Sequence, residues 1–298
     1  ARAAFFGAAR DGRGGLWRAM AGMIAIFVAM SATAIAVFLI GLGLETAGLI
    51  ARGAVSGGGA PALLLVSVVS LAAAIPAAAT VARVLHGRAP DGMLGAARRL
   101  RPGALAIGAL GAAALGGIGL ALAVALDLAS FSMIARPPFW WALSLALFLL
   151  IPLQAGAEEL VFRGYLAQEI GARAPLYLVW AGFTSALFAL AHMGGDPDRA
   201  PAYMTEVFAF GLFAAALVYW TGGISAATGF HTANNWVALL IFEPDVGVEG
   251  VGYVKISVDD AALWPLTLLS VALFALAAPV MRAALAPERP APGAEGGP

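Results

Sequence analysis

The sequence predicts an all-α fold, a polytopic membrane helical bundle of about eight transmembrane helices. The first observation is composition: 61% of the 298 residues are hydrophobic and 11% are charged, whereas roughly a quarter of the residues in a soluble domain are charged. The second is that apolar runs long enough to cross about 30 Å of hydrocarbon recur along the whole chain. The third is that basic and acidic residues gather in different loops. An ordinary soluble domain is therefore excluded.

Charge and cysteine content narrow the possible partners and chemistry. The formal net charge is zero and no basic run is interleaved with aromatic residues, so no nucleic acid partner is expected. The chain has no cysteine, which excludes disulfides, thiolate nucleophiles and cysteine-ligated metals. The lipid bilayer is the one partner that composition indicates, and the sequence does not indicate an oligomeric state.

Eight apolar runs are the expected spans. The first follows a basic segment, is too long for the core of a signal peptide, and is expected to be retained. Pro76 and Pro152 are expected to kink their helices. Gly108, Ala112 and Gly116 form a stripe that either admits a neighbouring helix closely or reflects Ala/Gly-rich composition. The expected spans are 19–44, 61–82, 103–126, 138–157, 176–193, 204–221, 224–242 and 262–281.

Three charges within six residues stand inside an apolar helix: Glu158, Glu159 and Arg163. A charged side chain in a bilayer costs at least about 2.5 to 3.5 kcal/mol, so these residues need partners or a chemical role. Glu159 and Arg163 are four apart with the acid first, which favours an ion pair on one helix face. Glu158 lies about 100° around the helix and has no obvious partner. The pattern predicts one paired, structural acid and one free, chemically active acid.

Two of the three histidines also lie in apolar runs. His192 follows Phe188 by four residues, and His231 precedes Asn235 by four, so each pair shares a helix face. A membrane histidine can be either a hydrogen-bonding partner between helices or a catalytic group. The third histidine, His86, lies in a basic loop and is expected to be solvated.

A helical hairpin would bring the first two sites together. If the chain turns near Ala174 and Pro175, Glu158 and His192 lie at nearly equal heights on antiparallel helices, at about 1.5 Å per residue. His231 follows Gly222-Gly223 by only a turn or two, which places it in the cytoplasmic half of the membrane. Matching all three depths requires the hairpin to extend into the cytoplasm, and this conflicts with the loop that starts directly after His192.

A glutamate and a histidine facing one buried cavity suit water activation, with one group taking the proton and the other orienting the nucleophile. His231 and Asn235 on one face suit an oxyanion hole, because imidazole and carboxamide groups can both donate. A metal site from Glu158, His192 and His231 is the alternative, but the H-E-x-x-H pattern of zinc helices is absent. No cofactor is therefore expected, with zinc as the less favoured reading.

In order, the motifs Glu158-Glu159-x-x-x-Arg163, Phe188-x-x-x-His192 and His231-x-x-x-Asn235 resemble those of the CAAX protease and bacteriocin-processing (CPBP or ABI) family of intramembrane glutamate endopeptidases. The likeness covers roughly 140–242. The resemblance implies hydrolysis of a membrane-associated peptide or protein by a water held on Glu158 and His192. It also implies that His231 and Asn235 stabilise the oxyanion, with Glu159, Arg163 and Phe188 in support. Asn234 is a neighbour of Asn235, and spacing favours Asn235.

The resemblance also bears on substrate and source. Eukaryotic members of the family cleave prenylated CAAX tails, whereas many bacterial members act on other substrates. The composition, rich in Ala, Gly and Arg and free of Cys, is typical of bacterial sequences, so no prenylated substrate is assigned.

Three other functions fit parts of the pattern. The polar residues can serve only to hold helices together. Glu and His in membranes also form proton relays in transporters, but spans before residue 138 carry almost no buried charge. A family member can also act as a non-proteolytic scaffold or immunity protein.

Loop charges predict the orientation. The arm 1–18 and the loop 83–101 are rich in arginine, whereas the loop 243–260 is mainly acidic. Because cytoplasmic loops carry the excess of Lys and Arg, both termini are expected in the cytoplasm, across a bacterial inner membrane. The expected division is a basic arm (1–18), N-terminal helices without catalytic motifs (19–137), a catalytic core (138–242), an external loop with the last span (243–285), and a disordered tail (286–298).

Overall fold

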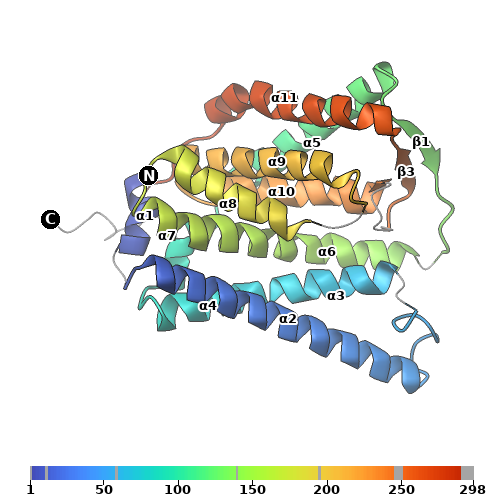
Figure 1. Ribbon diagram of the computed structural model, residues 1–298, viewed down its shortest axis with the longest axis horizontal. Coiled ribbons are helices and arrows are strands. Elements are labelled where there is room, and N and C mark those ends of the chain that lie inside the picture. The colour runs from blue at the N-terminus through green and yellow to red at the C-terminus, as the bar shows by residue number, and fades with distance from the viewer. Residues whose placement is uncertain are drawn as a thin grey trace.

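The computed structural model describes residues 2–10, 13–57, 60–138, 140–193, 196–244 and 251–289, and shows an elongated bundle of roughly parallel and antiparallel helices (Figure 1). The all-α membrane bundle is confirmed. The helices are α1 (Arg2–Arg10), α2 (Leu16–Thr46), α3 (Ala60–Ala72), α4 (Ala74–Val84), η1 (Pro90–Leu94), α5 (Pro102–Ala125), α6 (Trp140–Glu159), η2 (Leu160–Leu166), α7 (Ala167–Gly171), α8 (Tyr177–Ala191), α9 (Ala200–Thr221), α10 (Ser225–Trp236), η3 (Val237–Ile241) and α11 (Asp260–Ala284).

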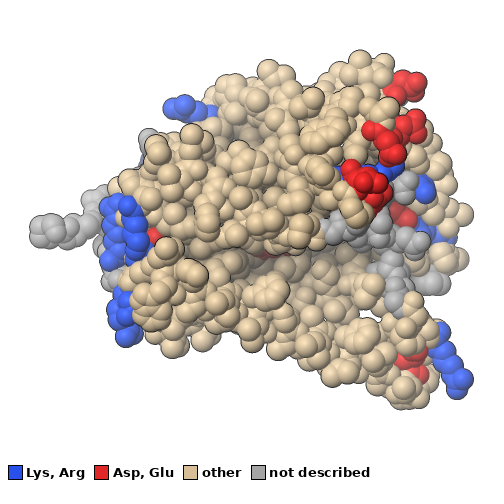
Figure 2. Space-filling view, viewed as in Figure 1, with Lys and Arg blue, Asp and Glu red and all other residues tan. Residues whose placement is uncertain are grey.

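The surface is apolar along the bundle and charged at its ends. In Figure 2, the end that carries the N-terminus shows arginine and lysine with few acidic atoms, whereas most acidic atoms lie at the opposite end, beside further basic ones. We call these the basic end and the acidic end. Within the described residues, six helices are long and apolar enough to cross a membrane, as expected of an integral membrane protein. The predicted spans 176–193 and 224–242 correspond to shorter helices, so a count of eight is not reached on length.

A small sheet at the acidic end was not predicted. Strands β1 (Ser130–Met133), β2 (Phe242–Pro244) and β3 (Val254–Ser257) follow the order β1-β3-β2, with β1 antiparallel and β2 parallel to β3. The acidic loop supplies β3 and the end of β2. Its residues 245–250, which include two of the predicted acids, lie outside the described residues.

The longest continuous helical segment, Trp140–Gly171, is formed by α6, η2 and α7. Pro152 lies inside α6 and has no N–H to offer the carbonyl of Phe148 four residues earlier. The indole Nε1 of Trp236 donates to that carbonyl at 3.0 Å, and the Trp236 and Phe148 rings stack at 4.4 Å. The proline is thus accommodated by a neighbouring helix, as membrane bundles require, and α6 is tied to α10.

Helix α8 resolves the depth conflict raised by the sequence. Its 15 residues span about 22 Å, less than the roughly 30 Å of a hydrocarbon core. It starts near the basic end and stops part-way along α6 (Figure 1). His192 therefore lies part-way along the bundle, near Glu158, rather than at one of its ends, and the predicted protrusion of the hairpin is unnecessary. Residues 194–195 of the following loop lie outside the described residues.

Close packing against α5 sets the position of α10. A Cβ at Gly108 would lie 2.1 Å from the carbonyl oxygen of Ala226, and one at Gly229 would lie 2.0 Å from that of Leu105. The two backbones therefore meet where only glycine fits. Of the predicted stripe of small residues, Gly108 lies at this contact and Ala112 is buried. A Cβ at Gly116 would meet nothing within 4 Å.

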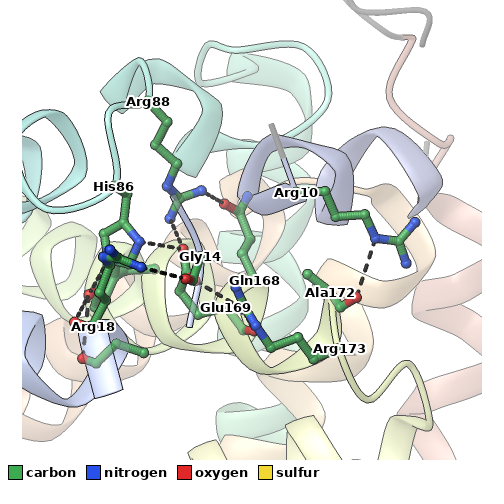
Figure 3. A network of polar contacts seen from close by, with 11 residues as sticks. Arg10, Gly14, Arg18, His86, Arg88, Gln168, Glu169, Ala172 and Arg173 are labelled. Carbon is green, nitrogen blue, oxygen red and sulfur yellow. Dashed lines mark hydrogen bonds and ion pairs between the residues drawn. The ribbon is translucent and has the colours of Figure 1, made fainter. Parts of the chain in front are cut away.

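A second polar cluster, at the basic end, corrects the prediction for His86 (Figure 3). The His86 ring is 1% exposed, with Nε2 at 2.8 Å from the hydroxyl of Tyr165 and Nδ1 at 3.4 Å from Glu169. Arg88 and Arg173 also pair with Glu169, at 3.3 and 3.1 Å. The sequence of the loop 83–101 does not reveal the partners of His86. Tyr165 belongs to η2 and Glu169 to α7, at the end of the helical segment Trp140–Gly171.

Described residues near each end of the chain pack against the helices. In the predicted arm, Phe5 and Phe6 are buried, and Phe6 lies edge-on to Trp180 of α8. In the predicted disordered tail, Glu288 is 2% exposed; its N–H donates to the carbonyl of Thr221 at 2.6 Å. The expectation of a disordered tail did not anticipate this packed position at Glu288. Residues 290–298 lie outside the described residues.

Candidate active site

Glu158 lies in the last turn of α6 with its side chain buried, 5% exposed. One carboxylate oxygen, Oε1, accepts a 2.6 Å hydrogen bond from Nε2 of Gln154. The expectation that Glu158 lacks a partner is therefore wrong for this oxygen. The other oxygen, Oε2, accepts no hydrogen bond from the described residues. It lies 3.6 Å from Nε2 of His231 and 3.9 Å from Nε2 of His192.

Glu159 forms the predicted pair with Arg163 at 3.0 Å, with both side chains fully buried. The guanidinium also donates to the carbonyl of Gly211 on α9 at 3.2 Å and lies 4.5 Å from the centre of the Phe188 ring. Glu159 further accepts from Nδ1 of His231 at 2.9 Å. This ion pair therefore joins its own helical segment to α8, α9 and α10, and the sequence indicated only the part of it within one helix.

His192 is the C-terminal cap of α8, where helix carbonyls lack intrahelical partners. Its Nδ1 lies 2.8 Å from the carbonyl oxygen of Phe188. Because that oxygen can only accept, Nδ1 carries the hydrogen and Nε2 is turned toward Glu158. The side chain is 29% exposed, so His192 is the more accessible of the two histidines at the site.

His231 and Asn235 lie on one face of α10, as their spacing predicted. The His231 ring is 2% exposed and meets the Phe188 ring edge-on at 5.8 Å. Asn235 donates from Nδ2 to Oε1 of Gln154 at 3.0 Å. Asn234 is exposed, so of the two neighbouring asparagines it is Asn235 that reaches the group around Glu158.

Sequence reasoning missed Gln154, which contacts both Glu158 and Asn235. The available signal was its spacing: a glutamine four residues before Glu158 shares its helix face, and buried polar groups in a bilayer need partners. The predicted facing of Glu158 and His192 is confirmed by their 3.9 Å separation.

The arrangement is suited to holding a water. A separation of 3.9 Å is too long for a direct hydrogen bond and fits a bridging molecule. Oε2 of Glu158 can only accept while ionised, and Nε2 of a neutral His192 also accepts, so one water can donate to both. Among the residues that the structure describes, no group of three or more His, Asp or Glu side chains has the arrangement of a metal site.

Fold and site together define an integral membrane protein with a buried cluster of carboxylate, imidazole and amide groups. Residues 137–237 match the family described as "Rce1-like: Type II CAAX prenyl endopeptidase Rce1-like". This match confirms, over that stretch, the family resemblance predicted from the three motifs. The family is one of proteases, which supports peptidase activity for this chain.

One curated relative is similar over a comparable length. The chain is 33% identical over 116 residues to YyaK of Bacillus subtilis (strain 168), described as an uncharacterized protein. The aligned segment spans 38% of this chain and 38% of that relative. The family match and this relative therefore bear on part of the chain.

Proposed function

We propose that this protein is an intramembrane endopeptidase that hydrolyses a peptide bond of a membrane-associated peptide or protein. The observation that carries the proposal is the buried Oε2 of Glu158, which faces the Nε2 atoms of His192 and His231 and accepts no hydrogen bond from the described residues. A water between Glu158 and His192 is in position to become the nucleophile. The match of residues 137–237 to a family of type II CAAX prenyl endopeptidases supports this chemistry.

Glu158 acts as the general base in the proposed reaction. The water oxygen bonds to the carbonyl carbon as Glu158 takes one water proton, and His192 orients the molecule through Nε2. Collapse of the tetrahedral intermediate breaks the C–N bond, and Glu158 returns the proton to the leaving amine. The products are a carboxylic acid and an amine, and Glu158 regains its ionised state.

His231 and Asn235 stabilise the oxyanion in this proposal. Asn235 has a second amide hydrogen besides the one bonded to Gln154. For His231, Nδ1 donates to Glu159, which accepts from Arg163 as well. Donation to an oxyanion from Nε2 therefore requires that the ring carry hydrogens on both nitrogens. The ion pair of Glu159 and Arg163 holds this ring in place.

Orientation and location are also proposals. The excess of arginine at the basic end supports placing that end in the cytoplasm. Glu158 lies 13 residues from Gly171, about 20 Å along the helix from the basic end. A substrate bond would then be cut inside the bilayer, near its middle.

The test compares membrane-associated peptides in cells that carry the wild-type protein or Glu158→Gln, which preserves shape but cannot take the proton. Peptides that accumulate only with the wild type are candidate products, and their precursors are then incubated with purified protein in nanodiscs. We expect cleavage by the wild type alone. Equal peptide patterns, or cleavage by Glu158→Gln at the wild-type rate, contradict the proposal. A prenylated CAAX peptide in the same assay tests that substrate class.

A further inference from the structure

The helical segment Trp140–Gly171 contains two buried glutamines, Gln154 and Gln168, and only Gln154 lies at the candidate active site. It is 6% exposed, one turn before Glu158 and on the same face of α6. Its amide makes two hydrogen bonds to groups of the site, from Nε2 to Glu158 at 2.6 Å and from Asn235 to Oε1 at 3.0 Å. It therefore bridges the proposed base and one proposed oxyanion donor.

The chemistry of these partners fixes the direction of each bond. An ionised carboxylate accepts only, so the nitrogen of Gln154 must face Glu158. Its oxygen then faces Asn235 and accepts from Nδ2. The oxygen of Asn235 in turn lies 3.3 Å from Nδ2 of Asn234. One amide of Gln154 thus determines which end of the Asn235 amide is presented as a donor.

We propose that Gln154 is a positioning residue that holds Glu158 ready as base and orients the Asn235 amide to donate. This inference rests on the proposed peptidase function and adds a residue to it. The short bond to Oε1 fixes the carboxylate plane, so that Oε2 faces the two histidines. The bond also stabilises the anionic form in a buried setting, since hydrogen bonds to charged groups are the stronger ones.

Loss of the donor therefore has a signature that a purely structural role lacks. Without the bond from Gln154, the Glu158 carboxylate loses one hydrogen bond, and the pH profile of its reaction with a carboxyl reagent should differ from that of the wild type. A carbodiimide reacts with protonated, buried carboxyl groups, so the pH midpoint of Glu158 labelling reports this change without any substrate. The other titratable or charged groups near Glu158 are Glu159 and Arg163 on its own helical segment, His192 on α8, Tyr203 on α9 and His231 on α10.

The experiment labels the full-length protein in nanodiscs with dicyclohexylcarbodiimide between pH 5 and 9 and quantifies the Glu158 adduct by mass spectrometry. Gln154→Met, which keeps the volume and loses the donor, should move the midpoint of labelling away from its wild-type value. Gln168→Met is the matched control, because Gln168 is equally buried but bonds to Arg88 and the carbonyl of Gly92 at the basic end. It should leave the midpoint unchanged.

Turnover of a cleaved peptide gives the second readout. Gln154→Met should lower kcat about tenfold to a hundredfold with little change in KM, and adding Asn235→Ala should lower it less than additively. If Gln154→Met does not fold, Gln154→Leu carries the same measurement, since its side chain is also apolar and cannot donate a hydrogen bond to Glu158. A wild-type midpoint in either variant overturns the inference. Absence of wild-type peptidase activity overturns the proposed function instead, and leaves the labelling result to be read separately.

Discussion

Nε2 of His192 lies 3.9 Å from Oε2 of Glu158, although the two residues belong to different helices and 33 residues separate them. The short length of α8 produces this relationship, because the helix ends where its capping histidine meets the last turn of α6. A full-length span would carry His192 past Glu158 toward the acidic end. The depth of the site is thus set by helix length as much as by helix packing.

Glu158→Gln and His192→Ala should each lower turnover by about 10² to 10⁴, the usual contribution of general acid–base groups. Both residues act on the same water in the proposed mechanism, so the double variant should be little worse than either single variant. Single-turnover rates on a cleaved peptide measure this. If the rate loss of the double variant equals the product of the two single losses, the two residues act independently, and the shared-water mechanism is contradicted.

Arg163→Ala should lower folding yield and stability as well as activity. It leaves Glu159 buried without its cation, and breaking a buried pair costs on the order of 3 to 5 kcal/mol. Removing both charges, with Glu159→Gln and Arg163→Met, should be milder than removing one. Thermal unfolding in detergent compares the three proteins. A double variant less stable than Arg163→Ala would contradict the supporting role of the pair.

How far the sequence predicts this site depends on the range of each interaction. The ion pair of Glu159 and Arg163 follows from their helical spacing alone, and the sequence predicted both residues of this pair. The contact of His231 with Glu159 joins residues 72 positions apart, and no local pattern encodes it. The count of eight spans is not confirmed, because 176–193 and 224–242 correspond to the shorter helices α8 and α10, and hydropathy alone does not show where a helix ends. Buried His86 and Glu288 were missed because their partners lie far away in the chain.

Single cysteines placed in the loops 83–101 and 251–260 should react with an impermeant maleimide from opposite sides of the membrane. The prediction rests on the basic end facing the cytoplasm, and the cysteine-free chain supplies its own background. In right-side-out vesicles, only the 251–260 site should be labelled. Labelling of both loops from one side would overturn the topology.

Activity should survive strong chelators. The described residues contain no group of three or more His, Asp or Glu side chains with the arrangement of a metal site, and the proposed base needs no metal to accept a proton. Turnover is compared before and after dialysis against EDTA and 1,10-phenanthroline. Loss of turnover that added zinc restores would favour a metalloprotease with Glu158, His192 and His231 as ligands.

Acidification should weaken the packing at the basic end through His86. Burial lowers the pKa of this histidine below its ordinary value, and neighbouring Arg88 acts in the same direction against Glu169. A base with a lowered pKa contributes stability above its ordinary pKa, near 6.5, and this stability is lost as pH falls through the folded-state value. Thermal unfolding at pH 7.5 and pH 5 should therefore show a larger loss of Tm on acidification for the wild type than for His86→Gln, which cannot be protonated. An equal loss in both proteins would assign the pH dependence to other groups.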